Sequence, residues 1–128
     1  KADYVDCLDK DKKKMDLSKY EYNDKISYFP DGFRKKVTDT ISPRALKHIN
    51  ELSKIKQTTN KRTIICYVIQ RTDVSSFQPS NIDPKYRNAV FEAVKHGVEV
   101  LPIVIKWTET GECYFVKDDL KVNIEINE

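Results

Sequence analysis

The sequence predicts an α/β fold, a mixed sheet that contains a strand-helix-strand crossover and is flanked by helices. Three segments carry this prediction: an apolar, β-branched run at residues 63–69, a helix pattern at 83–97 and a second apolar run at 98–105, which belongs to a strand predicted over 98–107. Such crossovers are almost always right-handed and place their two strands parallel. Because the first run is apolar without alternation, we expect it to be buried on both faces, as in parallel sheets between helices.

The first part of the chain is highly charged. Residues 1–28 hold seven lysines and seven acidic residues, and residues 9–25 lack an apolar period, so we expect a solvated loop or insertion over 1–28. The irregular region continues to about Ile41. Because the chain starts with Lys1 and not with Met, we expect the natural N-terminus to lie upstream.

A helix is predicted at residues 43–57, because Ser42 is a favourable N-cap and proline a favourable first residue. One half of its helical wheel is apolar and is expected to face the core: Ala45, Leu46, Ile49, Leu52 and Ile55. The other half is mainly basic, with Arg44 and Lys47, while His48 lies on the border. This charged half is either an ordinary solvated helix face or a surface that meets phosphates.

The crossover helix is predicted to begin at Pro84 with Asp83 as N-cap and to end before Gly97. Its buried stripe is expected to consist of Tyr86, Ala89, Val90, Ala93 and Val94. Between residue 73 and this helix we expect a loop.

The second strand of the crossover contains Pro102, which lacks a backbone donor and is therefore expected at a sheet edge or a bulge. The chain then predicts a hairpin that turns at Gly111. The alternation of apolar and polar residues over 120–126 predicts a last, amphipathic strand.

Composition and charge limit the class of protein. The 128 residues, 39% hydrophobic and 34% charged, suit one globular domain, and no run is long enough to predict a membrane span. The net charge is only +3, but residues 29–62 hold nine basic against three acidic residues, an excess of +6. A phosphate-bearing partner would meet this middle region.

Common catalytic and metal-binding motifs are missing from the sequence. It has no phosphate loop, no dinucleotide-binding glycine motif and no H-E-x-x-H. The D-x-K pattern does occur, at Asp11, Asp83 and Asp119, but these matches are explained by a charged loop, a helix cap and a turn, respectively. For His96, at a helix end, a contact with the helix dipole is expected. We therefore predict no metal ligand.

The three cysteines form no C-x-x-C pair, which favours a reducing, intracellular compartment over a disulfide framework. Cys66 lies inside the first apolar run. We expect it to be a small buried hydrophobic residue and not a nucleophile.

The most informative polar segment is Gln70, Arg71, Thr72 and Asp73, directly after the first strand. The carboxyl ends of strands in α/β sheets commonly border a crevice, so these side chains are candidates for binding. A purely structural role is the alternative, with Asp73 pairing with Arg71 or capping the turn.

An ordered set of short motifs resembles the sugar fermentation stimulation protein A (SfsA) family: Tyr28-Phe-Pro-Asp31, Ser42-Pro-Arg-Ala-Leu-Lys-His-Ile-Asn-Glu-Leu52, Val68-Ile-Gln-Arg-Thr-Asp73, Phe77, Ile82-Asp-Pro-Lys-Tyr86 and Gly97-Val-Glu-Val-Leu101. Residues 32–40 are extra to the family pattern. The resemblance implies that residues 29–128 are the C-terminal part of a DNA-binding domain similar to the PD-(D/E)xK nucleases.

The resemblance also implies which residues contact DNA or line the site: Arg44, Lys47, His48, Gln70, Arg71 and Asp73. The family's acidic strand residue and its E-x-K strand lie upstream of the Phe-Pro-Asp motif, so no catalytic residue is assigned here. No cofactor is expected unless the complete protein is catalytic, in which case it would use Mg²⁺. Two alternatives stay open: an active Mg²⁺-dependent nuclease when full length, and a degenerate scaffold that binds protein.

Overall fold

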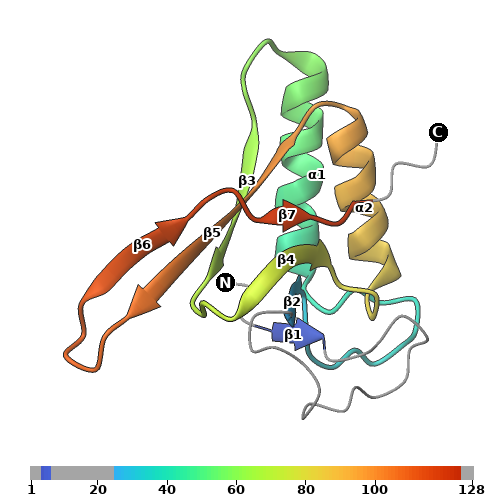
Figure 1. Ribbon diagram of the computed structural model, residues 1–128. Coiled ribbons are helices and arrows are strands. Elements are labelled where there is room, and N and C mark those ends of the chain that lie inside the picture. The colour runs from blue at the N-terminus through green and yellow to red at the C-terminus, as the bar shows by residue number, and fades with distance from the viewer. Residues whose placement is uncertain (1–3, 7–24, 125–128) are drawn as a thin grey trace.

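The computed structural model describes residues 4–6 and 25–124, which form two sheets and two helices (Figure 1). In chain order the elements are β1 (Tyr4–Asp6), β2 (Lys25–Phe29), α1 (Pro43–Thr58), β3 (Ile64–Ile69), β4 (Val74–Pro79), α2 (Pro84–Lys95), β5 (Glu99–Trp107), β6 (Cys113–Lys117) and β7 (Lys121–Val122). The four-stranded sheet has the order β1-β2-β4-β7 and the three-stranded sheet the order β3-β5-β6. The mixed α/β fold class is therefore confirmed.

The predicted crossover forms the centre of the structure. β3 and β5 pair in parallel, from Ile64 opposite Glu99 to Ile69 opposite Val104, and α2 belongs to the connection between them. β5 then turns back into β6 as an antiparallel hairpin, with Gly111 at a φ of +86° in the turn. The hairpin projects beyond the helices (Figure 1).

Both helices begin at their predicted capping residues, α2 ends just before Gly97 as predicted, and α1 ends one residue later than predicted, at Thr58. The Ser42 hydroxyl accepts a hydrogen bond from the Ala45 amide at 3.3 Å, and the Asp83 carboxylate accepts one from the Tyr86 amide at 3.0 Å. After α2 the chain turns at Gly97 with a φ of +102°, a conformation that glycine adopts without strain.

The predicted apolar stripes of the helices face the core, as expected. Ile49, Tyr86, Val90 and Ala93 are fully buried, and the remaining predicted positions on both stripes, apart from the partly exposed Ile55, pack against them. Burial of side chains of this size stabilises a fold by about 1.5–3 kcal/mol each.

Three strands, β1, β2 and β4, lie where the sequence predicted irregular structure. Residues 74–79 were expected to be a loop but form β4, and Lys25–Phe29, within the expected charged region, forms β2. Serine, glutamine and proline in β4 disfavour strand locally, but β4 pairs in parallel with β2 and with β7 and buries Val74 and Phe77. Tertiary pairing thus overrides local propensity. Residues 7–24 of the predicted loop lie outside the described residues.

The expectation that β3 is buried on both faces is wrong. Tyr67 and Ile69 are buried, whereas Ile64 is 38% exposed and Cys66 is also exposed. Alternate side chains of a strand point to opposite faces, and α1 and α2 cover only the face that carries Tyr67. The prediction that Cys66 is buried fails for the same reason.

Near the C-terminus the predictions are met in part. β5 is the central strand of its sheet, but β6 pairs only with residues 104–107 of β5. At Pro102, β5 is therefore paired on one side only, with β3. The last strand is shorter than predicted, because β7 has two residues and residues 125–128 lie outside the described part.

An aromatic cluster joins the two sheets and α2. The ring centroids of Tyr67 and Phe77 lie 4.4 Å apart and those of Phe29 and Tyr86 5.5 Å. The hydroxyls of Tyr67 and Tyr86 share a hydrogen bond of 2.6 Å inside the protein. Burial raises the pKa of Tyr67 well above its usual range and that of Tyr86 to about 12, so both hydroxyls stay protonated at neutral pH.

This buried pair predicts a non-additive mutant cycle. Tyr67→Phe or Tyr86→Phe alone should lower the free energy of unfolding by about 1–2 kcal/mol, because each change leaves one buried hydroxyl without its partner. The double variant should lose clearly less than the sum, since neither hydroxyl remains. Urea unfolding of the four proteins measures this, and strictly additive losses would contradict a direct bond between the hydroxyls.

Candidate functional site

Asp73 organises the polar cluster at the carboxyl end of β3. Its carboxylate accepts hydrogen bonds from Arg71 Nε at 2.5 Å and Arg71 Nη2 at 2.6 Å, and from Lys25 Nζ at 2.7 Å. The two-pronged bond from the Arg71 guanidinium, helped by Lys25, holds the pKa of Asp73 well below its usual range although burial opposes ionisation. The pairing of Asp73 with Arg71, which was one form of the purely structural alternative, is confirmed.

Gln70 connects this strand end to the next strand. Its side-chain oxygen accepts a hydrogen bond of 2.7 Å from the indole nitrogen of Trp107. A hollow of about 480 Å³ lies between the ends of the two strands, lined by Gln70, Arg71, Thr72, Asp73, Ile105, Lys106 and Trp107. The predicted polar segment therefore does border a crevice.

Three residues of this cluster were not predicted: Lys25, Lys106 and Trp107. The parallel register offered a signal for the last two, because residues that follow β3 must lie beside the second half of β5. No local signal marked Lys25, which is 48 positions from Asp73 in the sequence.

The predicted α1 residues lie elsewhere on the surface. Arg44, Lys47 and His48 are all exposed, and Lys47 borders a second hollow together with residues of α1 only, 3.9 Å from Glu51 Oε1. The structure thus brings Gln70, Arg71 and Asp73 together but places Lys47 on a separate surface.

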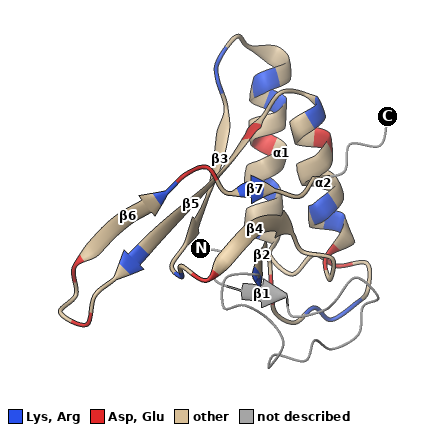
Figure 2. Cartoon of the chain, viewed as in Figure 1, with Lys and Arg blue, Asp and Glu red and all other residues tan. Residues whose placement is uncertain are grey.

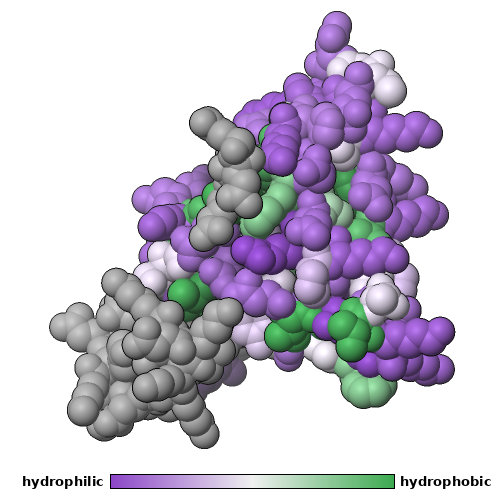
Figure 3. All heavy atoms as spheres, turned by 90° about the vertical axis from the view of Figure 1, so that its right-hand side faces the viewer, coloured by the Kyte–Doolittle hydropathy of each residue, from purple (hydrophilic) through white to green (hydrophobic). Residues whose placement is uncertain are grey.

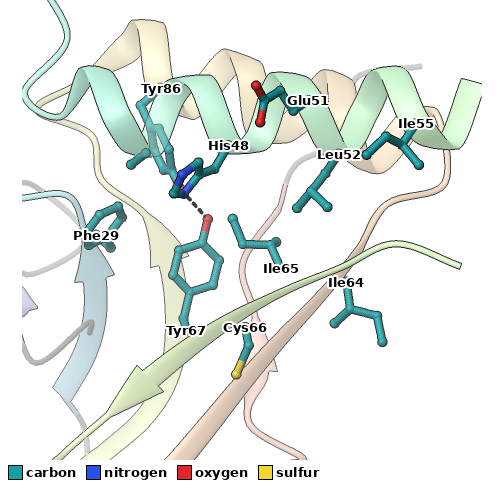
Figure 4. A pocket seen from close by; sticks show the side chains of 11 residues that line it. Phe29, His48, Glu51, Leu52, Ile55, Ile64, Ile65, Cys66, Tyr67 and Tyr86 are labelled. Atoms are coloured by element: carbon teal, nitrogen blue, oxygen red, sulfur yellow. Dashed lines mark hydrogen bonds between the residues drawn. The ribbon is translucent and has the colours of Figure 1, made fainter.

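His48 lines a third hollow, of about 450 Å³, between α1 and β3. Figure 4 shows His48 and Tyr67 pointing into this space from opposite sides, whereas Cys66 points away from α1. Most of its other walls are apolar, including Leu52, Ile55 and Ile65. Because the thiol lies on the far side of the strand from the imidazole, the hollow offers no cysteine-histidine pair for nucleophilic chemistry.

The charges are distributed unevenly over the fold. Lysine and arginine occur on both helices and on the loop that leads into α1, whereas carboxylates mark the turn of the β5–β6 hairpin (Figure 2). The face on the side of α2 is mainly hydrophilic (Figure 3). Neither helix in the described part of the chain has the length and apolarity needed to cross a membrane.

The described residues do not fit a Mg²⁺ site. Within residues 4–6 and 25–124, no group of three or more His, Cys, Asp or Glu side chains could hold a metal ion. The Asp73 carboxylate binds two cationic side chains. Asp83 of one D-x-K motif is a buried helix cap, as expected, and Asp11 of another lies outside the described residues.

The Nδ1 atom of His96 lies 2.7 Å from the Glu92 carbonyl at the end of α2, which confirms the expected helix-end contact.

The Asp73 cluster predicts acid-sensitive stability. The folded-state pKa of Asp73 lies below the unfolded value of about 3.9, so its ionised form contributes stability that is present above about pH 4 and lost as the pH falls toward the folded pKa. Asp73→Asn should cost about 2 kcal/mol at pH 7 and progressively less below about pH 4. Urea unfolding at pH 7 and pH 3 measures the difference. Asp118→Asn, at an exposed position, is the control, and equal losses for Asp73→Asn at both pH values would contradict the assignment.

Known proteins are similar to this chain in sequence and in fold. Residues 13–111 match the family described as sugar fermentation stimulation protein RE domain. A sugar fermentation stimulation protein homolog of Crocosphaera subtropica is 37% identical over 99 residues, which cover 77% of this chain and 37% of that protein. A homolog of Lawsonia intracellularis is 39% identical over 74 residues, 57% of this chain and 28% of that protein.

The structure of Pyrococcus furiosus SfsA in complex with Ca²⁺ is similar, with a TM-score of 0.64, 28% identity, and coverage of 82% of this chain and 41% of that one. The chain thus spans well under half the length of these relatives. With about three quarters of its residues matched to the family, and with the same fold, the chain belongs to the sugar fermentation stimulation protein family.

Proposed function

We propose that this chain is a DNA-binding, nuclease-like domain that contacts phosphates at the carboxyl end of β3 and along α1. The observation that carries the proposal is the charge balance at the strand end. Lys25 and Arg71 both bond the carboxylate of Asp73, and Arg71, Asp73 and Lys106 line the same hollow. Among the described residues that line this hollow, two cations stand against one carboxylate, and this balance favours an anionic group such as a phosphate.

The Asp73 ion pairs also support a binding role through geometry. They hold the Arg71 guanidinium, which is only one-third exposed, in a fixed orientation. A fixed arginine loses less side-chain entropy when a phosphate binds than a mobile one does. The cluster is therefore preorganised as well as positive.

Helix α1 supplies the second surface. Arg44 and Lys47 are three positions apart and therefore project from neighbouring points of the exposed helix face, and both are exposed. The local excess of +6 over residues 29–62 favours the same interpretation. A duplex that touches both surfaces would use backbone contacts, which position DNA without reading its sequence.

Catalysis is a separate proposal that concerns the whole protein. The related Pyrococcus furiosus protein was solved in complex with Ca²⁺, but the described residues here supply no carboxylate cluster for a metal. If the complete protein is a Mg²⁺-dependent nuclease, its metal ligands must come from outside the described residues. Cleavage of single- and double-stranded DNA with and without Mg²⁺ tests this alternative.

The DNA-binding proposal predicts a change in both affinity and salt dependence. Replacing Arg44 and Lys47 by alanine removes two phosphate contacts, which should reduce the slope of log K against log salt by about 2 and the affinity by roughly eightfold per contact at ~0.1 M salt. Arg71→Ala should act in the same direction for its single contact, and the Asp73 carboxylate keeps its bond to Lys25 in this variant. Fluorescence anisotropy of labelled duplex DNA at several salt concentrations measures both quantities.

Lys95→Ala is the matched control, because Lys95 is an exposed cation at the end of α2, 3.2 Å from Glu92 Oε1. It should leave the affinity close to that of the unmodified protein. If the α1 and strand-end variants bind DNA with unchanged affinity and slope, the assigned residues are wrong. If the unmodified protein shows no salt-dependent affinity for DNA, the protein-binding scaffold becomes the better interpretation.

A further inference from the structure

One face of the three-stranded sheet is apolar and largely uncovered by the described residues. The alternation along β3 and β5, and the register between β5 and β6, place one set of side chains on the face opposite to α1 and α2. We call it the outer sheet face; it consists of Ile64, Cys66, Val68, Leu101, Ile103, Ile105, Cys113 and Phe115. None of these eight side chains carries a charge, and none belongs to the buried core or to the residues packed against it.

The outer sheet face is exposed to different degrees along its length. Phe115 is 64% exposed and Ile64 38%, both thiols are exposed, and the remaining four side chains are half-buried. Polar pairs border it at two ends. Arg62 and Glu99 form a two-pronged ion pair at one end, and Gln70 bonds Trp107 at the other. An apolar centre with a polar rim is the usual anatomy of a protein interface.

We propose that the outer sheet face is an internal interface of the whole protein, covered by an amphipathic helix from outside residues 1–128. A parallel strand pair such as β3 and β5 is normally covered by helices on both faces, and α1 and α2 cover one of them. The inference does not depend on DNA binding.

The chemistry of the face favours a helix over the other occupants. A nucleic acid would need cations, and this face has none among its eight side chains. An added strand would pair with the edge of β3 and would leave the face itself open. The apolar stripe of a helix matches a continuous apolar sheet surface.

The lengths of the relatives favour a helix of the same polypeptide over a second copy of the chain. The matched region covers 37% of the Crocosphaera subtropica homolog and 41% of the Pyrococcus furiosus chain. More than half of each relative is therefore available to complete the second layer.

Two native thiols make the proposal testable, because Cys66 and Cys113 both lie on the outer sheet face. In the whole protein under native conditions, alkylation of each should be at least about tenfold slower than in the same protein unfolded by guanidinium, since a covered thiol reacts only after local opening. Mass spectrometry of peptides after timed exposure to N-ethylmaleimide measures each cysteine separately, so Cys7 does not interfere.

Lys85→Cys provides the exposed control, because position 85 lies on the solvent side of α2, and its native and unfolded rates should be similar. Repeating the experiment from about 0.1 to 100 μM protein separates the occupants, since an internal cover gives protection that does not change with dilution. Native rates for Cys66 and Cys113 as fast as that of the control would overturn the proposal. Protection that disappears on dilution would also overturn it, in favour of a second copy of the chain.

Discussion

The buried carboxylate of Asp83 fixes where both helices begin. It is fully buried and accepts hydrogen bonds from the Tyr86 amide of α2, from the Ile41 amide at 2.7 Å and from the Thr40 hydroxyl at 2.7 Å, just before α1. Burial alone would raise its pKa, but these bonds outweigh burial and the pKa is lowered. One side chain thereby satisfies the start of α2 and anchors the segment that leads into α1, so the two helices are placed side by side over the sheet.

This placement explains how the rest of the core forms. With their starts joined, α1 and α2 direct Ile49, Tyr86 and Val90 toward the same face of β3 and β5. Tyr86 then meets Tyr67 from the strand, and Phe29 and Phe77 extend the contact to the second sheet. Asp73 performs a comparable task at the strand end, since it ties Lys25 of β2 to the segment between β3 and β4. Two buried carboxylates therefore link elements that the chain itself separates.

Local signals predicted the parts of the fold that depend on local physics. The caps Ser42 and Asp83, the crossover and the hairpin at Gly111 are confirmed, because capping, periodicity and turn geometry are encoded within a few residues. β2 and β4 were missed because their stability comes from pairing with each other over some 50 positions. For the site, the pairing of Asp73 with Arg71 was foreseen from their spacing, whereas Lys25 and Trp107 reach the cluster only through tertiary structure. The roles of Arg44, Lys47 and His48 in binding remain predictions.

The exposed face of β3, which was predicted to be buried, is apolar. A sheet with one face in water normally alternates apolar and polar residues, but Ile64, Cys66 and Val68 are apolar although they face away from the helices. Along the same strand, the polarity changes within one step from Ile69 to Gln70, where the polar hollow begins. The face and the strand end thus differ in chemistry, although they adjoin at Ile105, which belongs to the face and also lines the hollow. Trp107 lies at their border, where its indole nitrogen donates a hydrogen bond to the Gln70 side chain.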